Sequence, residues 1–270
     1  MNHTRKAYVL KMDIKGYFMN IDRNILLEIC LDTFERMRLH KSDEADKTWE
    51  EKLDYPFIRY LSEVIIMNDQ VKGCRRVGKY SDWNALPRSK SLFFSPDGCG
   101  LPIGNLTSQL FSNVYMNEYD QFMKRILRNK AYGRYVDDSY VVGKHKGELR
   151  YITEVATEFL KIRLGLEVHT NKTTIYHTNH GVSFLGAYLK PHRCYIHTKT
   201  LSRLLNCLKK VIKEEKPVVI CNSINSYLGT LSHYYSYRLR YNIMKSHPEL
   251  FRYGYFGKSI LKYRLRHTYN

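Results

Sequence analysis

The chain has 270 residues, enough for one large domain or two small ones. It carries 44 Lys and Arg against 26 Asp and Glu, a formal net charge of +18 that favours a phosphate-rich partner. No segment reaches the roughly 18 apolar residues of a membrane-spanning helix, no cleavable signal precedes the first predicted strand, and six cysteines without metal-binding spacing indicate reduced thiols, so we expect a cytoplasmic protein without a membrane partner.

The amino-terminal part begins with an apolar strand over residues 7–14, which carries Asp13 near its end. Apolar spacing predicts a helix from Asn24 and a second one from Tyr55 to Asn68. The charged run 40–52 is typical of a loop. Residues 71–100 hold glycines and prolines with little periodicity, so we expect an irregular excursion there.

The central part contains the strongest helical pattern, from Ser108, a candidate cap, to Arg128. Strand-forming residues on both sides of a tight acidic turn then predict a β-hairpin over 131–142. The remaining expected elements are a helix over 147–164, paired strands over 174–189, and helices over 200–215 and 222–244.

The acidic turn Tyr135-Val136-Asp137-Asp138 is the most informative feature. Adjacent carboxylates repel each other unless a cation or a proton lies between them. An isolated Asp-Asp pair is usually an exposed turn, but Asp13 supplies a third carboxylate on a separate strand. Three such groups suit a two-metal phosphoryl-transfer site, to which the carbonyl of Ile14 would add an oxygen ligand.

These segments resemble the palm motifs of reverse transcriptases. Five motifs stand in that family's order over about residues 8–190, and this order is more specific than any one of them. They are Asp13-Ile14-Lys15-Gly16-Tyr17-Phe18, the loop-helix motif Gly100-Leu101-Pro102-Ile103-Gly104-Asn105-Leu106-Thr107-Ser108-Gln109, Tyr135-Val136-Asp137-Asp138, Leu166-Glu167-Val168-His169-Thr170-Asn171-Lys172-Thr173 and Gly181-Val182-Ser183-Phe184-Leu185-Gly186-Ala187-Tyr188.

The resemblance implies an RNA-directed DNA polymerase that uses two Mg²⁺ ions, with Mn²⁺ as a possible substitute. It implies that Lys172 neutralises or protonates the leaving pyrophosphate, and that Phe18 is an aromatic gate that favours dNTPs over rNTPs. The expected site residues are, for catalysis, Asp13, Asp137, Asp138 and Lys172; for metal binding, Asp13, Ile14, Asp137 and Asp138; and for nucleotide or template binding, Phe18, Ile103, Gly104, Asn105 and Gln109.

The loop-helix motif is similar to that of the reverse transcriptases of diversity-generating retroelements, which copy a template RNA with frequent errors opposite adenine. Many reverse transcriptases have a glutamine where this chain has Ile103 and a proline where it has Gln109. Isoleucine offers no hydrogen bond to the nascent base pair, which would weaken discrimination between bases. The alternative is that Ile103 only packs beneath the loop.

The expected fold is α+β: a polymerase palm with a small antiparallel sheet backed by helices, plus a helical thumb. We place the palm, with a remnant of the fingers, at 1–190 and a basic thumb at 191–270, where 15 Lys and Arg stand against 3 Glu and 10 of the 23 tyrosines lie. Cations interleaved with rings suit a nucleic-acid surface. The first motif starts near residue 7, so the fingers that clamp the incoming triphosphate are largely missing and autonomous catalysis is in doubt.

The expected partners are template RNA, primer, cDNA, dNTPs and a basic accessory protein, for which the Tyr- and Arg-rich stretch 234–266 is a candidate surface. The alternatives are a group II intron-like or defence-associated reverse transcriptase, or a truncated nucleic-acid-binding remnant without autonomous activity. Metal-dependent nucleotide addition separates these possibilities.

Overall fold

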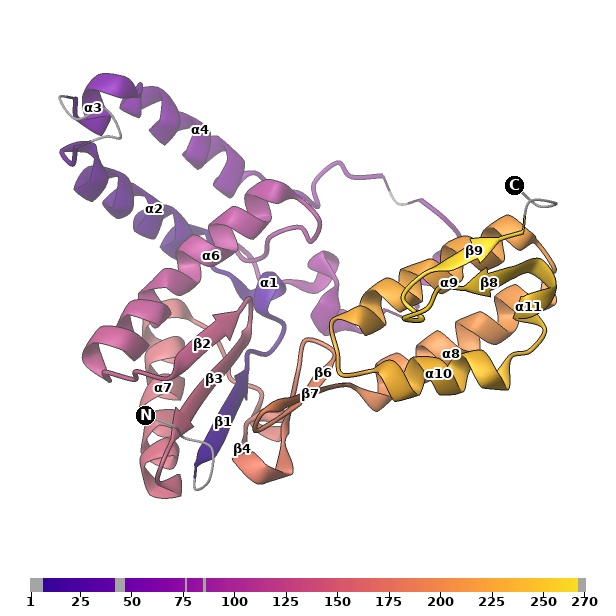
Figure 1. The fold of residues 1–270 in the computed structure, drawn as a ribbon. Helices are drawn as coiled ribbons and strands as arrows, with labels where there is room; N and C mark the ends of the chain where they lie inside the picture. The colour runs from indigo at the N-terminus through magenta and orange to yellow at the C-terminus, as the bar shows by residue number, and fades with distance from the viewer. Residues whose placement is uncertain (1–6, 42–46, 76, 85, 267–270) are drawn as a thin grey trace. The chain divides into compact units, whose positions relative to one another are not determined.

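The computed structural model describes residues 7–41, 47–75, 77–84 and 86–266. They form two compact units, which divide between Ile175 and Tyr176. The second unit combines the hairpin strands that follow Tyr176 with the helices that come after them. Helices combine with small antiparallel sheets, which confirms the predicted α+β class (Figure 1).

The first unit is built on a sheet in the order β2-β3-β1-β4, in which β1 and β2 each pair antiparallel with β3, and β4 begins in the first unit and ends in the second. Its strands are β1 (Tyr8–Asp13), β2 (Tyr132–Tyr135), β3 (Asp138–Gly143) and β4 (Thr174–His177). Side chains alternate between the two faces of a strand. In β1, Leu10 and Met12 are therefore buried in the core, whereas Lys11 lies on the same face as Asp13.

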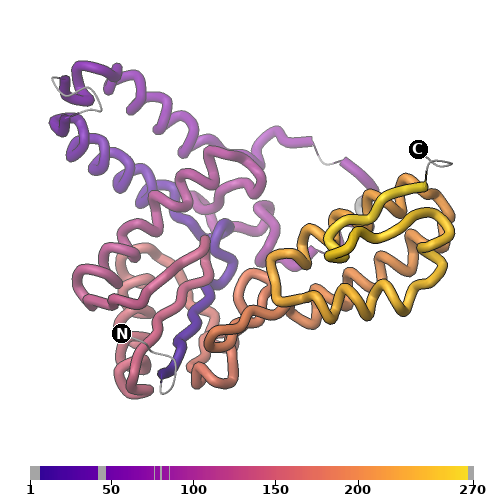
Figure 2. Tube along the Cα trace, viewed as in Figure 1, coloured from indigo at the N-terminus to yellow at the C-terminus, as the bar shows by residue number. Residues whose placement is uncertain are grey.

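Helices α6 (Leu106–Gln121) and α7 (Lys146–Leu164) pack on the apolar face of this sheet. The other helices of the unit are α1 (Tyr17–Asn20), α2 (Arg23–Arg38), α3 (Trp49–Lys52), α4 (Tyr55–Met67), α5 (Tyr80–Trp83) and a π-helix (Phe122–Ile126). Figure 2 shows α2 and α4 running side by side. Fully buried Tyr115 and Tyr119 of α6 lie in the same core as Leu10 and Met12.

Local chemistry explains where these helices begin and end. The Asp22 side chain accepts hydrogen bonds from the N–H groups of Asn24 and Ile25, and Asp54 caps α4 in the same way through Phe57. Gly165 ends α7 with φ 61°, a conformation that favours glycine. The predicted cap of α6 is wrong: Asn105 precedes the helix, and Ser108 is buried within it.

The second unit contains a three-stranded sheet, four helices and a two-stranded hairpin among the described residues. These are β5 (Val182–Phe184), β6 (Ala187–Lys190), β7 (Arg193–Ile196), α8 (Thr198–Lys213), α9 (Pro217–Ser232), α10 (Tyr237–Ser246), α11 (Leu250–Tyr253), β8 (Gly254–Phe256) and β9 (Tyr263–Leu265). The single helix predicted over 222–244 is instead two helices, α9 and α10, with a break between Ser232 and Tyr237. No helix among the described residues is long and apolar enough to cross a bilayer.

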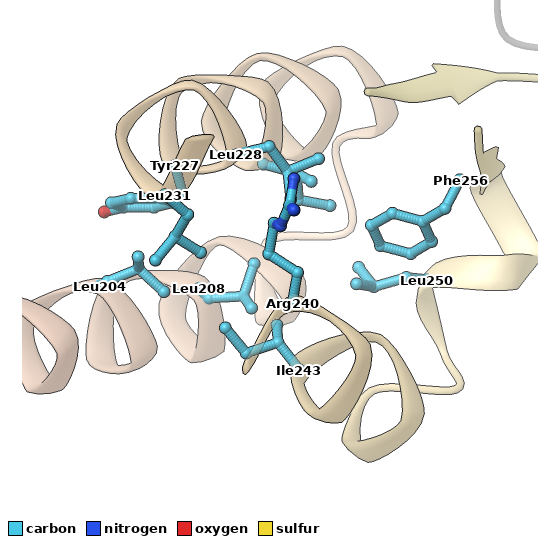
Figure 3. A pocket seen from close by; sticks show the side chains of 10 residues that line it. Leu204, Leu208, Tyr227, Leu228, Leu231, Arg240, Ile243, Leu250 and Phe256 are labelled. Atoms are coloured by element: carbon cyan, nitrogen blue, oxygen red, sulfur yellow. The ribbon is translucent and has the colours of Figure 1, made fainter. Parts of the chain in front are cut away.

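One charged side chain lies in the apolar interior of the second unit. Arg240 is 8% exposed, and it lines a small pocket with leucines of α8 and α9 and with Phe256 (Figure 3). Its Nη1 donates a long hydrogen bond of 3.4 Å to the carbonyl of Ile260, and among the described residues its Nε has no hydrogen-bond partner. Burying a charge with so little compensation is costly.

We therefore expect Arg240→Met to raise the free energy of unfolding by roughly 1–4 kcal/mol, because methionine fills similar volume without a charge to desolvate. Urea unfolding of the whole chain measures this effect. The control is Arg238→Met, an exposed position on the same helix, which should change stability by less than about 0.5 kcal/mol. A loss of stability in Arg240→Met alone would contradict the prediction.

Candidate active site

The acidic turn is a two-residue loop between β2 and β3. Tyr135 and Asp138 are paired across the hairpin, so Val136 and Asp137 alone make the connection. Val136 has φ 56°, the left-handed region, which the tight turns of β-hairpins require at their first central residue. A β-branched residue rarely adopts this conformation. The surrounding structure must therefore hold the turn in place.

The pairing of β1 with β3 places Asp13 directly opposite Asp138, and thereby beside the turn. Sequence analysis could not derive this register, since the two residues are 125 positions apart. Asp13 is 8% exposed, and the two aspartates lie on the same face as Lys11 and Tyr140, which are also paired. The structure thus brings three predicted site carboxylates, those of Asp13, Asp137 and Asp138, to one end of the sheet.

Two lysines contact these carboxylates. Lys172 Nζ lies 2.7 Å from Asp13 Oδ2, and Lys11 Nζ lies 3.3 Å from Asp138 Oδ1. Burial lowers the pKa of Lys11, but contacts with Tyr140 and Asp138 outweigh it and leave the pKa raised. Lys11 was missed by our sequence analysis, although the two-residue period of a strand puts it on the same face as Asp13.

The backbone fixes Lys172 beside the strand end. The N–H of His169 donates to the carbonyl of Asp13 at 2.7 Å, and the N–H of Lys172 donates to the carbonyl of His169 within a short turn, Thr170–Lys172. The backbone N–H of Lys15 likewise donates to the backbone carbonyl of Glu167. The bonds from His169 and Lys15 lie on either side of the bridge between Ile14 and Val168, and neither of them uses the carbonyl of Ile14.

The pKa of the Asp137 carboxyl is raised. Burial raises the pKa above its usual value, and the neighbouring charges of Asp13 and Asp138 raise it further. A hydrogen bond from its own backbone N–H and the charge of Lys172 only partly offset these effects. Crowded carboxylates of this kind favour a bound cation.

The donor set fits a magnesium site that substrate completes. The described residues contain no ready cluster of three or more acidic, histidine or cysteine ligands. Mg²⁺ is, however, usually held by one or two carboxylates together with substrate phosphates, so a preformed cage is not required. Asp13, Asp137 and Asp138 supply hard oxygen donors of the appropriate kind at one place.

The loop-helix motif is tied to the residues after Asp13. The N–H of Leu101 donates to the carbonyl of Phe18 at 2.8 Å, which places the predicted gate next to the loop. The half-buried ring of Phe18 contacts Tyr17 edge-on, with centroids 5.4 Å apart. Gly104 has φ 105° in open space, so the backbone conformation alone calls for glycine.

The other predicted binding residues are exposed at the start of α6. Asn105 precedes the helix, and its side chain makes no capping bond to it. Gln109 is exposed in the first turns of α6. Ile103 is 68% exposed, so it does not pack beneath the loop as the alternative interpretation required. All three side chains are therefore accessible to a ligand.

Comparison with known proteins gives the family. Residues 1–189 match the family model described as reverse transcriptase (RNA-dependent DNA polymerase). Protein YkfC of Escherichia coli (strain K12) is 30% identical, over 32% of this chain and 31% of its own length. The chain thus spans about a third of this curated relative.

Solved structures add a likeness of fold. Telomerase from Candida tropicalis in complex with a fragment of telomeric RNA aligns with a TM-score of 0.50 and 15% identity, over 90% of this chain and 42% of that one. Telomerase from Candida albicans, also in complex with a telomeric RNA fragment, aligns with a TM-score of 0.49 and 12% identity, over 92% of this chain and 40% of that one. Because the family model covers well over half of the sequence, this chain belongs to the reverse transcriptase family.

Proposed function

We propose that this chain adds dNTPs to a primer on an RNA template by two-metal phosphoryl transfer. The observation that carries the proposal is the pairing of Asp13 with Asp138 across β1 and β3, with Asp137 next to Asp138 in the turn and Lys172 at hydrogen-bond distance from Asp13. These residues come from three of the motifs that resemble the family's palm.

Asp13, Asp137 and Asp138 would hold the metal, with the carbonyl of Ile14 as a further ligand. Bound divalent ions supply charge neutralisation for the attacking and leaving oxygens. The protein's own residues position the substrate: Phe18 excludes the 2′-hydroxyl of an rNTP, and Lys172 delivers a proton or positive charge to the leaving pyrophosphate. Gly104, Asn105 and Gln109 contact the template or the incoming nucleotide.

The finer proposal is error-prone cDNA synthesis in a diversity-generating retroelement. It is supported by the exposed, apolar Ile103 beside Asn105 and Gln109. We further propose a palm over 1–190, a basic thumb over 191–270 and a basic accessory protein, in the cytoplasm of a bacterium or encoded by a phage. A group II intron-like or defence-associated enzyme and a remnant that only binds nucleic acid are the competing functions.

Primer extension on an RNA template with Mg²⁺ and dNTPs tests the proposal. The comparison is between the chain itself, a variant with both Asp137→Ala and Asp138→Ala, and Glu158→Gln, which removes an exposed carboxylate of α7. We expect extension by the chain and by Glu158→Gln, and none by the double variant. Equal product from all three would contradict catalysis at this site.

The subfamily has a separate test in the same assay. Ile103→Gln restores a side chain that can hydrogen-bond the nascent pair, so we expect misincorporation opposite template adenine to fall by about 10-fold. Leu106→Gln, an exposed change on the next element, is the control. Low misincorporation by the unmodified chain would favour one of the competing reverse transcriptase types.

A further inference from the structure

The catalytic turn needs a residue that keeps Val136 in its unfavourable conformation. A two-residue hairpin loop accepts φ 56° readily when glycine or asparagine occupies the position, but valine resists it. Such an outlier persists only where neighbouring groups over-determine the backbone. The question is therefore which group contacts the backbone of Val136.

Arg134 makes that contact. Its Nη1 donates to the carbonyl of Val136 at 2.8 Å, inside the turn that carries Asp137. The Arg134 side chain is 8% exposed, so water competes little for this bond. The Arg134 side chain therefore binds the backbone two residues further along the chain, at the residue with the left-handed conformation.

Asp120 of α6 holds the guanidinium in place. Arg134 Nε lies 2.9 Å from Asp120 Oδ1 and Nη2 lies 2.7 Å from Oδ2, which is a two-pronged ion pair. Tyr132, on the same face of β2, donates its hydroxyl to Asp120 Oδ1 at 2.6 Å. A planar arginine matched to a carboxylate in this way has a fixed direction, which a lysine does not reproduce.

The same helix carries Gln109, one of the predicted binding residues. Arg134 Nη1 also lies 3.4 Å from Asn113 Oδ1, and Asn113 Nδ2 donates to the carbonyl of Gln109 at 3.1 Å. The Arg134 side chain thus joins the turn to two positions on α6, one in the middle of the helix and one near its end. The arrangement connects the catalytic turn to the helix whose first residues belong to the loop-helix motif.

We propose that Arg134, held by Asp120, is a positioning residue that locks Val136 in the left-handed conformation and thereby presents Asp137 and Asp138 to substrate. This inference rests on the proposed function for its catalytic consequence, but the lock itself is a property of the hairpin. Val136→Gly removes the steric cost of the left-handed conformation, because glycine adopts it freely. The turn of this variant should therefore depend less on the hydrogen bond from Arg134.

The test is a double-mutant cycle of Arg134→Lys and Val136→Gly in the full chain. We expect Arg134→Lys to lower kcat for primer extension by about 10-fold to 100-fold with little change in KM for dNTP, because a misplaced reacting group costs turnover rather than binding. Adding Val136→Gly should recover at least about 5-fold of the loss. Arg150→Lys, an exposed arginine of α7, is the control and should match the unmodified chain.

Amide hydrogen exchange of residues 132–142 provides a readout that needs no activity. Arg134→Lys should speed exchange in this hairpin while α7 stays protected. If the unmodified chain extends no primer, the proposed function fails, and exchange alone decides on the lock. Unchanged exchange and turnover in Arg134→Lys would overturn the inference. So would a general loss of folding stability in Arg134→Lys that Val136→Gly deepens, since that is the mark of a merely structural ion pair.

Discussion

Asp137→Asn is expected to abolish Mg²⁺-dependent extension, by at least about 10³-fold, and at the same time to stabilise the metal-free protein at neutral pH. The two effects have one cause. The raised pKa of Asp137 means that its ionised form is disfavoured in the folded chain by burial and by Asp13 and Asp138. The amide has no charge to desolvate and gives a metal a much weaker ligand.

The pH dependence has a definite sign. When the folded-state pKa is above the unfolded value, the folded state binds protons more tightly, and stability falls as pH rises from the unfolded pKa through the folded one. The gain in free energy of unfolding from Asp137→Asn should therefore be largest above the raised pKa of Asp137. This gain should vanish as the pH falls toward 3.8, the ordinary pKa of an aspartate. Urea unfolding in EDTA between pH 4 and pH 8 measures it.

Magnesium should reverse the order of stability. A ligand that binds only the folded state stabilises it, so Mg²⁺ should raise the melting temperature of the unmodified chain but not that of Asp137→Asn. Glu158→Gln, which neutralises an exposed carboxylate, should respond to Mg²⁺ as the unmodified chain does. A lower stability of Asp137→Asn in EDTA at pH 8 would show that the charge is compensated in the fold.

Local patterns in the sequence predicted much of the first unit. Alternation of apolar and polar residues predicted the strand that carries Asp13 and the hairpin around Asp137. Apolar residues repeated at helical spacing predicted α7. The break between α9 and α10 was missed because residues 233–236, His-Tyr-Tyr-Ser, contain no Pro or Gly to interrupt the helical pattern. The β8–β9 hairpin was missed because its strands have three residues each, too few for a period to show.

In the candidate site, too, the sequence predicted some residues and missed others. The three aspartates stand in recognisable motifs, so the sequence could name them without giving their contacts. Arg134 carries no such signal, because its importance lies in a carboxylate of α6 and in the backbone angle of Val136. Contacts that depend on tertiary register and on a single φ angle are not periodic, and only a structure supplies them.

Phe18→Ala is expected to lower discrimination between dNTPs and rNTPs by about 10-fold to 100-fold. Both the backbone and the ring of Phe18 are held: the N–H of Leu101 donates to the carbonyl of Phe18 at 2.8 Å, and the ring of Tyr17 packs edge-on against that of Phe18. A ring fixed in this way presents a rigid surface to the sugar. Removing it leaves room for a 2′-hydroxyl without touching the carboxylates, so dNTP turnover should fall much less than rNTP turnover rises.

The measurement is the ratio of kcat/KM for dNTP and rNTP in single-nucleotide extension. Phe34→Ala is the matched control, because Phe34 is also a partly buried ring packed on the same core but lies on α2. Both variants lose comparable packing, so both should lose stability, and only Phe18→Ala should change the ratio. If dNTP and rNTP extension fall together in Phe18→Ala as in Phe34→Ala, Phe18 is a core residue and the gate lies elsewhere. A changed ratio in Phe18→Ala alone, with Mg²⁺ dependence retained, assigns sugar selection to this ring and metal binding to the aspartates of β1 and the hairpin.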